Sequence, residues 1–112
     1  MDLTFNKNED HNKLQLSELR KKLGQVALGG GKAKMEKHRA KGKMTARERV
    51  DFLLDENTER IEIGALAGDG MYQEHGGCPS AGVVIKIGYV SGKLAVIVAN
   101  DATVKAGAWF PI

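Results

Sequence analysis

The polypeptide has 112 residues, of which 42% are hydrophobic and 28% are charged, and its formal net charge is +3. A chain of this length makes at most one domain, and its composition is ordinary for a soluble globular protein. No apolar run approaches the roughly 20 residues of a membrane-spanning helix, and the polar amino terminus lacks the apolar stretch of a secretory signal. The single cysteine, Cys78, excludes an internal disulfide and favours a reducing compartment, so we expect a cytoplasmic protein.

The charges are unevenly distributed. Residues 32–49 contain eight basic and two acidic residues, a net charge of +6, so the rest of the chain sums to −3. Such a block indicates where an anion is attracted. Aromatic residues make up only 5% of the chain and are not interleaved with the block, which weakens a single-stranded nucleic-acid interpretation. The basic residues are Lys32, Lys34, Lys37, Arg39, Lys41, Lys43, Arg47 and Arg49.

Two helices are expected in the first 40 residues, after a start at 1–13 that we expect to be frayed or disordered. The pattern predicts the first helix over about 12–28, because its apolar residues recur at helical spacing. These residues are Leu16, Leu19, Leu23 and Val26. Three glycines at 29–31 then predict a stop and a flexible joint. The second helix, over 32–40, is very basic and has almost no apolar face, so it needs a partner surface to persist.

A capping box is predicted at the start of a third, short helix. The sequence Thr-Ala-Arg-Glu at 45–48 lets the Thr45 hydroxyl accept a hydrogen bond from the Glu48 amide, while the Glu48 carboxylate accepts one from the Thr45 amide. This helix should end near residue 55. Its core-facing side is expected to carry Val50, Leu53 and Leu54.

The later part of the chain predicts strands around a long loop. A short strand is expected at 61–63, and the glycine-rich stretch 64–82 has a length typical of functional or poorly ordered loops. Alternating apolar residues predict a strand over 83–88, followed by a Ser-Gly hairpin turn at 91–92. The unbroken apolar run 94–99 is typical of a strand buried on both faces inside a larger layered fold.

The chain ends on a bulky apolar cluster, Trp109-Phe110-Pro111-Ile112. A natural domain rarely leaves large aromatic residues at a free terminus. We therefore expect the elements that cover this cluster to lie outside the sequence, and the chain to be part of a longer protein.

Three segments stand in a specific order and spacing. The first is GGGKAKMEKHRAKGKMTARERVDFLLD at 29–55, the second is the glycine-rich linker into VVIKIGYVSGKLAVIVANDATV, and the third is ANDATVKAGAWFPI at 99–112. Together they resemble the carboxyltransferase (β) subunits of biotin-dependent acyl-CoA carboxylases, which belong to the crotonase-like superfamily. The NDATVKAG stretch before WFP looks like the methylcrotonyl-CoA branch of that family rather than the propionyl-CoA branch.

The resemblance implies an α/β fold of the crotonase-like type, with a helical arm at 1–57 and the start of the acyl-CoA-binding core at 58–112. It implies that the carboxyl group of carboxybiotin, delivered on a carrier domain, is transferred to an acyl-CoA such as methylcrotonyl-CoA. The implied partners are that acyl-CoA, a biotin carboxylase and carrier subunit, and further β subunits in a homo-oligomer, with neither nucleic acid nor membrane. The backbone donors that stabilise the enolate lie further along the chain in this family. We therefore assign no catalytic residue and expect the 112 residues alone to be inactive.

Lys105 is the strongest candidate for a ligand contact. It follows a buried strand at a polar turn, a place where α/β layers bind ligands, and in the resembling family this loop lies beside the CoA phosphates. The alternative is a solvated loop lysine. Ala106 and Gly107 either let the backbone approach CoA or simply form a turn.

Other cations of the basic block are further candidates for the CoA phosphates: Lys41, Lys43 and Arg47. They form either such a site or a solvated face, and Arg47 and Arg49 could instead pair with acidic residues of their own helix. No metal site is assigned to His75 and Cys78, because no second Cys/His pair completes it. No orienting group is evident for a Cys–His nucleophile either.

Two other classes of function stay open from the residues alone. A small nucleic-acid-binding module needs only the basic block, but leaves the strands and the NDATVKAG segment unexplained. A protein-interaction domain would dock through the helical arm and through exposed Trp109 and Phe110.

Overall fold

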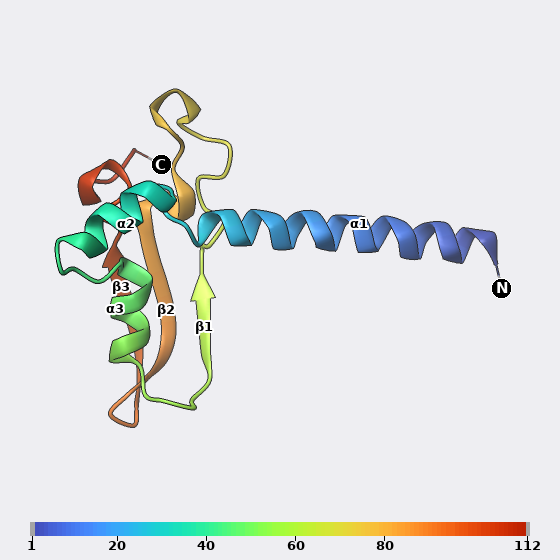
Figure 1. Cartoon of the computed structure of the whole chain (residues 1–112). Coiled ribbons are helices and arrows are strands. Elements are labelled where there is room, and N and C mark those ends of the chain that lie inside the picture. Colours follow the sequence, from blue (N-terminus) through green and yellow to red (C-terminus); the bar gives the residue numbers. More distant parts are fainter. Residues whose placement is uncertain (1, 112) are drawn as a thin grey trace.

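The computed structural model describes residues 2–111. Figure 1 shows α2, α3 and the strands gathered in one body, from which α1 projects. Met1 and Ile112, which belong to the predicted disordered start and apolar ending, lie outside the described residues. The helices are α1 (Leu3–Val26), α2 (Lys32–Ala40) and α3 (Ala46–Leu53), and the strands are β1 (Arg60–Ile63), β2 (Val83–Val90) and β3 (Lys93–Asn100).

The three strands form one antiparallel sheet in the order β1-β2-β3. Val90 pairs with Lys93 across the Ser-Gly turn, so the predicted hairpin is confirmed. The backbone amides of Ser91 and Gly92 each donate to the Asp55 carboxylate at 2.7 Å, which ties the hairpin to the segment after α3. All three predicted strands are present.

The core lies between α3 and one face of the sheet. Val50 is 1% exposed and Leu54 is 4% exposed, and both belong to one cluster with Val84 of β2 and Ala99 of β3. Burial of these aliphatic side chains is the main favourable term for the packing of α3 on the strands.

α3 begins with the predicted capping box. At its end, the side chain that turns toward the sheet differs from the prediction. The Glu48 amide donates to Thr45 Oγ1 at 3.3 Å, and the Thr45 amide donates to the Glu48 carboxylate at 2.9 Å. Leu53, which we expected in the core, is 51% exposed. The helix ends at Leu53 and the backbone becomes extended at Leu54, so Leu54 turns toward the sheet in place of Leu53.

The second face of the sheet is open within residues 2–111. Leu94, Val96 and Val98 of β3 are 67%, 64% and 56% exposed. Ile61 and Ile63 of β1 continue this face, because the register aligns them through β2 with Val96 and Val98. We call these five residues the open sheet face. Within residues 2–111 only the other face of β3 is covered, by α3. Burial of β3 on both faces inside a larger fold stays a prediction.

α1 begins earlier than predicted. The Asp2 carboxylate caps the helix by accepting a hydrogen bond from the Thr4 amide at 3.0 Å. The expectation of a frayed or disordered start is therefore wrong for residues 2–13, which lie in or cap a continuous helix. Its end at Val26 confirms the stop predicted from the glycines that follow.

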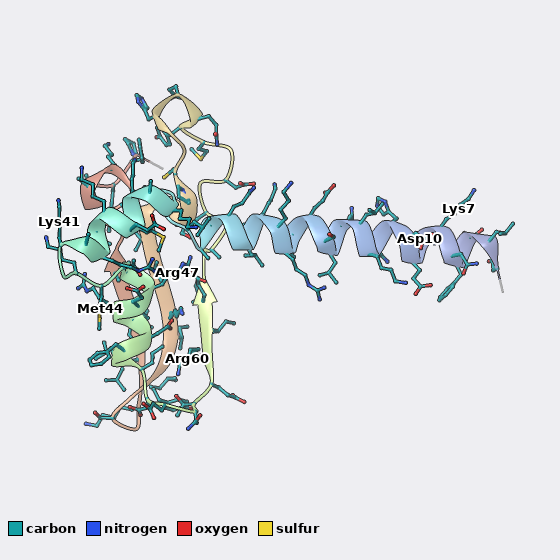
Figure 2. All side chains as sticks on the ribbon, in the orientation of Figure 1. Lys7, Asp10, Lys41, Met44, Arg47 and Arg60 are labelled. Carbon is teal, nitrogen blue, oxygen red and sulfur yellow. The ribbon has the colours of Figure 1, made fainter. Side chains whose placement is uncertain are left out.

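α1 makes little contact with the rest of the molecule. None of its residues is buried, and Figure 2 shows Lys7 and Asp10 on the stretch that projects away from the body. Its predicted apolar face is also exposed, with Leu16 at 45% and Leu19 at 41%. Within residues 2–111 no helix, α1 included, combines the length and apolar character needed to cross a bilayer.

α2 covers the predicted residues 32–40. Its one buried side chain is Met35, 7% exposed, which docks this otherwise basic helix on the body. The segment 64–82 is irregular, as expected, and contains two short 3-10 turns, Gln73–His75 and Pro79–Gly82.

The end of the described chain is only partly covered. Trp109 is 64% exposed, as expected for an uncovered cluster. Phe110 stacks on Tyr72 of the long loop, with ring centroids 4.3 Å apart. The loop thus contributes a partner that the sequence pattern did not indicate.

Candidate functional site

A depression of about 310 Å³, here called the basic depression, lies between α2 and the turn that follows β3. Three sequence candidates, Lys41, Lys105 and Ala106, meet there although they are far apart in the chain. The wall from α2 and its end consists of Lys34, Lys37, His38 and Lys41. The opposite wall consists of Ala102, Thr103, Lys105 and Ala106.

The turn after β3 has a strained backbone. Lys105, Ala106 and Gly107 have φ angles of 46°, 53° and 86°. A left-handed conformation suits glycine, whereas a residue with a Cβ that is held there carries strain of about 1–3 kcal/mol. Val104, 3% exposed, anchors the turn, and its carbonyl accepts a hydrogen bond from the Gly107 amide at 2.9 Å. Such strain is found at functional sites and in other tight turns of this chain, so a role for Ala106 and Gly107 beside a ligand stays a prediction.

The Lys105 ammonium lies beside the aromatic end of the described chain. Its Nζ is 4.3 Å from the centre of the Phe110 ring and 3.3 Å from the carbonyl oxygen of Trp109, to which it donates. A cation over an aromatic face and one hydrogen bond hold the group in place. An ammonium has three N–H donors, so donors remain after the hydrogen bond to the Trp109 carbonyl.

The remaining sequence candidates do not line the basic depression. The Gly107 carbonyl accepts a hydrogen bond from Asn100 Nδ2 at 3.1 Å. The Arg47 guanidinium lies 2.5 Å from the Glu62 carboxylate and donates to the Ser80 hydroxyl at 3.3 Å. Its acidic partner is therefore on β1, whereas the alternative considered from the sequence was an acidic residue of its own helix. For Lys43, Arg47 and Gly107, contact with a ligand stays a prediction.

Five residues that line the basic depression were not among the candidates for CoA contact: Lys34, Lys37, His38, Ala102 and Thr103. The first three share a helical face with Lys41, because positions three and four apart on a helix are neighbours. That spacing could have found them. The His38 ring is oriented by its contact with the Met44 carbonyl, 2.9 Å from Nε2.

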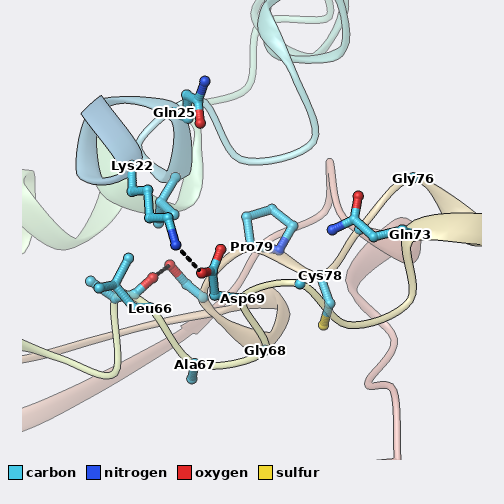
Figure 3. Close-up of a pocket in the computed structure, with 15 residues that line it drawn as sticks. Lys22, Gln25, Leu66, Ala67, Gly68, Asp69, Gln73, Gly76, Cys78 and Pro79 are labelled. Atoms are coloured by element: carbon cyan, nitrogen blue, oxygen red, sulfur yellow. Dashed lines mark hydrogen bonds and ion pairs between the residues drawn. The ribbon is translucent and has the colours of Figure 1, made fainter. Parts of the chain in front are cut away.

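A second pocket, of about 240 Å³, lies between the end of α1 and the long loop (Figure 3). Lys22 and Asp69 form an ion pair at 2.8 Å, drawn as a dashed line in Figure 3. The hydrogen bond to Asp69, and next its charge, raise the pKa of Lys22. The pocket also contains Gln25 and Gln73 but no enclosed cluster of charges.

Cys78 lines this second pocket and offers no evident chemistry there. It is 2% exposed, and burial raises the pKa of its thiol, while the nearby charge of Lys105 opposes the shift. A buried, protonated thiol is a poor nucleophile. Within residues 2–111 no three His, Cys, Asp or Glu side chains are grouped to hold a metal ion.

Residues 37–112 match the family model of the carboxyl transferase domain. The match covers more than half of the 112 residues, and the chain therefore belongs to the carboxyl transferase domain family. Within it, the chain is 45% identical over 104 residues to the biotin-dependent 3-methylcrotonyl-coenzyme A carboxylase beta1 subunit of Mycobacterium tuberculosis, covering 93% of this chain and 19% of that protein. It is 43% identical over 97 residues to the probable mitochondrial methylcrotonoyl-CoA carboxylase beta chain of Drosophila melanogaster, covering 87% of this chain and 17% of that protein.

Solved structures agree on the fold. Transcarboxylase 12S, described as a hexamer assembly with methylmalonyl-coenzyme A bound, has a TM-score of 0.73 and 30% identity, over 83% of this chain and 18% of that one. The beta subunit of P. aeruginosa geranyl-CoA carboxylase has a TM-score of 0.75 and 25% identity, over 97% of this chain and 20% of that one. The α/β, crotonase-like carboxyltransferase fold is thereby confirmed.

The chain spans about a fifth of the length of these relatives, 19% of the mycobacterial one. The family match favours the carboxyltransferase interpretation of the chain over the nucleic-acid-binding alternative, for which none of these relatives gives support.

Proposed function

We propose that this chain is part of the carboxyltransferase subunit of a biotin-dependent acyl-CoA carboxylase, acting on an acyl-CoA of the methylcrotonyl type. The observation that carries the proposal is the 45% identity to a methylcrotonyl-CoA carboxylase subunit, which extends over 93% of the chain. In this reaction the carboxyl group passes from carboxybiotin to the acyl-CoA. The proposal divides the chain into a helical arm at 1–57 and the start of an acyl-CoA-binding core at 58–112. The absence of buried residues in α1 supports the assignment of this helix to an arm.

The contribution of this chain, in our proposal, is to bind the phosphates of CoA in the basic depression. CoA carries a pyrophosphate and a 3′-phosphate, and clustered ammonium groups attract such a polyanion. Lys41 approaches from the end of α2 and Lys105 from the opposite wall. At Ala106 the side chain is a single methyl group, which lets a phosphate approach the strained turn.

Biotin is the cofactor of this reaction, and on a carrier it supplies the carboxyl group. The basic depression presents ammonium groups, whereas the ring system of biotin is uncharged and gains little from them. We therefore assign no described residue to biotin and derive no step through it. The proposed partners are a biotin carboxylase and carrier subunit and further copies of the β subunit. The hexamer described for transcarboxylase 12S supports the latter, and the free thiol of Cys78 agrees with a cytoplasmic location.

The first experiment measures binding of CoA by calorimetry in the intact native protein that carries this chain. The variant Lys41→Ala/Lys105→Ala should weaken binding about tenfold or more, because each lost ammonium removes a hydrogen bond between charged groups. Lys93→Ala, which removes an exposed lysine at the start of β3, is the matched control and should leave the affinity unchanged.

Shorter ligands then locate the contact. Dephospho-CoA and pantetheine should bind progressively more weakly to the wild-type protein, and pantetheine should be insensitive to the double substitution. Equal affinity of the wild type and the double variant for CoA would remove the basic depression from the proposal. Loss of carboxyl transfer without any change in CoA affinity would point to another role for these lysines.

A further inference from the structure

The joint between α1 and α2 crosses directly over the turn that forms one wall of the basic depression. The Gly30 amide donates a hydrogen bond to Thr103 Oγ1 at 2.9 Å. This bond connects positions that are 73 residues apart in the sequence. It lies immediately before α2, which begins at Lys32 and supplies the other wall.

The Thr103 hydroxyl is held by a second residue. It donates to Asp101 Oδ1 at 2.6 Å, and the same oxygen accepts a hydrogen bond from the Thr103 amide at 2.9 Å. The hydroxyl proton of Thr103 is therefore donated to Asp101, and the hydroxyl oxygen accepts the hydrogen bond from the Gly30 amide. Because Thr103 is 6% exposed, water cannot easily replace either contact.

The backbones at this crossing are too close for any side chain. A Cβ at Gly30 would overlap the carbonyl oxygen of Thr103 and lie 2.6 Å from its carbon. A Cβ at Gly29, whose φ is 53°, would meet the Thr103 hydroxyl at 2.8 Å. The glycines at 29 and 30 thus serve as a contact surface, beyond the flexible joint that their sequence predicts.

This crossing holds together two walls whose charges repel each other. Lys34, Lys37 and Lys41 line one wall and Lys105 lines the other, and among residues 2–111 no acidic side chain lines the basic depression. Without a bound anion, like charges favour separation of the walls. α2 has one buried side chain, Met35, so its position depends on the hydrogen-bonded crossing before its first turn and on the ion pair of Arg39 with Glu48 near its end.

We propose that Thr103 is a positioning residue, whose hydroxyl, oriented by Asp101, holds the Gly29–Gly30 crossing so that the lysines of α2 and Lys105 converge on one polyanion. The proposal rests on the proposed function in naming that polyanion as the phosphates of CoA. Thr103 itself need not touch the ligand. Its effect is exerted through the placement of α2 relative to the turn.

The test uses Thr103→Val, which keeps the shape of the side chain and removes the hydroxyl, in the intact native protein. The KM for acyl-CoA should rise about fivefold to tenfold, the equivalent of one lost buried hydrogen bond, while kcat stays within about twofold. Thr103→Ser restores the hydroxyl and should return KM to the wild-type value. Thr58→Val is the matched control, because Thr58 donates its hydroxyl to the Asp55 carbonyl at 2.7 Å, at the other end of α3 from the basic depression, and should leave KM unchanged.

A second measurement reports on the geometry without using CoA. A short amine-reactive cross-linker followed by mass spectrometry should join Lys41 to Lys105 in the wild type and in Thr103→Ser, and much less in Thr103→Val. An unchanged cross-link in Thr103→Val overturns the positioning role. If Lys41→Ala/Lys105→Ala leaves CoA affinity intact, the basic depression is not the CoA site, but loss of the cross-link in Thr103→Val still supports the positioning role.

A third measurement needs no variant and applies even if Thr103→Val does not fold. Because coupling between two sites is reciprocal, a polyanion that binds better to the assembled crossing must also stabilise it. Saturation of the wild-type protein with CoA should therefore slow hydrogen exchange of the Gly30 amide, and pantetheine, which has no pyrophosphate or 3′-phosphate, should not. Unaltered exchange at Gly30 on saturation with CoA overturns the proposal.

Discussion

At the scale of single residues, Glu48 joins α3 to α2, the helix that lines one wall of the candidate site. Its carboxylate accepts hydrogen bonds from Arg39 Nε of α2 at 2.7 Å and from the Thr45 amide at the start of α3 at 2.9 Å. The hydrogen bond from Arg39, and next that from Thr45, lower the pKa of Glu48 from its ordinary value of 4.5. Glu48 thus couples the end of the basic helix to the helix that packs on the sheet.

A pH dependence of stability follows from this shift. With a pKa lower in the folded than in the unfolded state, Glu48 stabilises the protein fully above the unfolded value of 4.5, and this contribution is lost as the pH falls through the lower folded value. Glu48→Gln should therefore flatten the loss of stability in acid. Urea unfolding from about pH 7 to about pH 3 measures it, with Glu56→Gln at an exposed turn as control. Parallel curves for wild type and Glu48→Gln would contradict the assignment.

Contacts between residues differ in how far the sequence predicts them. The capping box was predictable because its geometry is set within four consecutive positions, from Thr45 to Glu48. The hydrogen bond between Gly30 and Thr103 was not, because it joins positions 73 apart that only the folded chain brings together. The same reason explains why the acidic partner considered for Arg47 from the sequence lay in its own helix, whereas its partner is Glu62 of β1.

At the scale of elements, α3 attaches to the sheet through one narrow face. Val50 is 1% exposed and Leu53 is 51% exposed, although both are aliphatic residues of the same helix. Val50→Ala should lower the free energy of unfolding by about 2 kcal/mol, through lost burial and the cavity left behind. Leu53→Ala should change it by less than about 0.5 kcal/mol. Denaturant titration followed by circular dichroism compares the two, and equal losses would place Leu53 in the core.

Helix ends and turns were predicted well where a local sequence signal is strong. Features that depend on contacts between distant parts of the chain were predicted poorly. The glycines at 29–31 marked the end of α1, and the hairpin turn marked the β2–β3 connection. The start of α1 was missed because residues 6–13 are all polar and the cap at Asp2 is a single side chain. For β3 the apolar run indicated burial, but a sequence cannot say whether the covering element lies within the same 112 residues.

At the scale of the whole molecule, the open sheet face is an apolar surface that no helix or strand of residues 2–111 covers. Its residues Ile61, Ile63, Leu94, Val96 and Val98 are each 45% or more exposed. Exposed Trp109 and partly exposed Phe110 line an apolar groove that reaches Val98. Contiguous apolar surface of this kind marks an interaction site or an aggregation liability. The 112 residues on their own should therefore self-associate.

Replacing part of this face with charge tests the prediction directly. In the 112-residue polypeptide, Val96→Lys/Val98→Lys should reduce self-association measured by analytical ultracentrifugation and lower the binding of an apolar dye, because charged side chains resist burial. Leu3→Lys/Leu14→Lys adds the same charge at α1 positions that are 76% and 66% exposed and lie off the open sheet face. If both variants reduce self-association equally, net charge rather than the open sheet face governs it. If only the β3 variant does, the face is the surface through which the chain meets its covering partner, whether a further segment of the protein or another subunit.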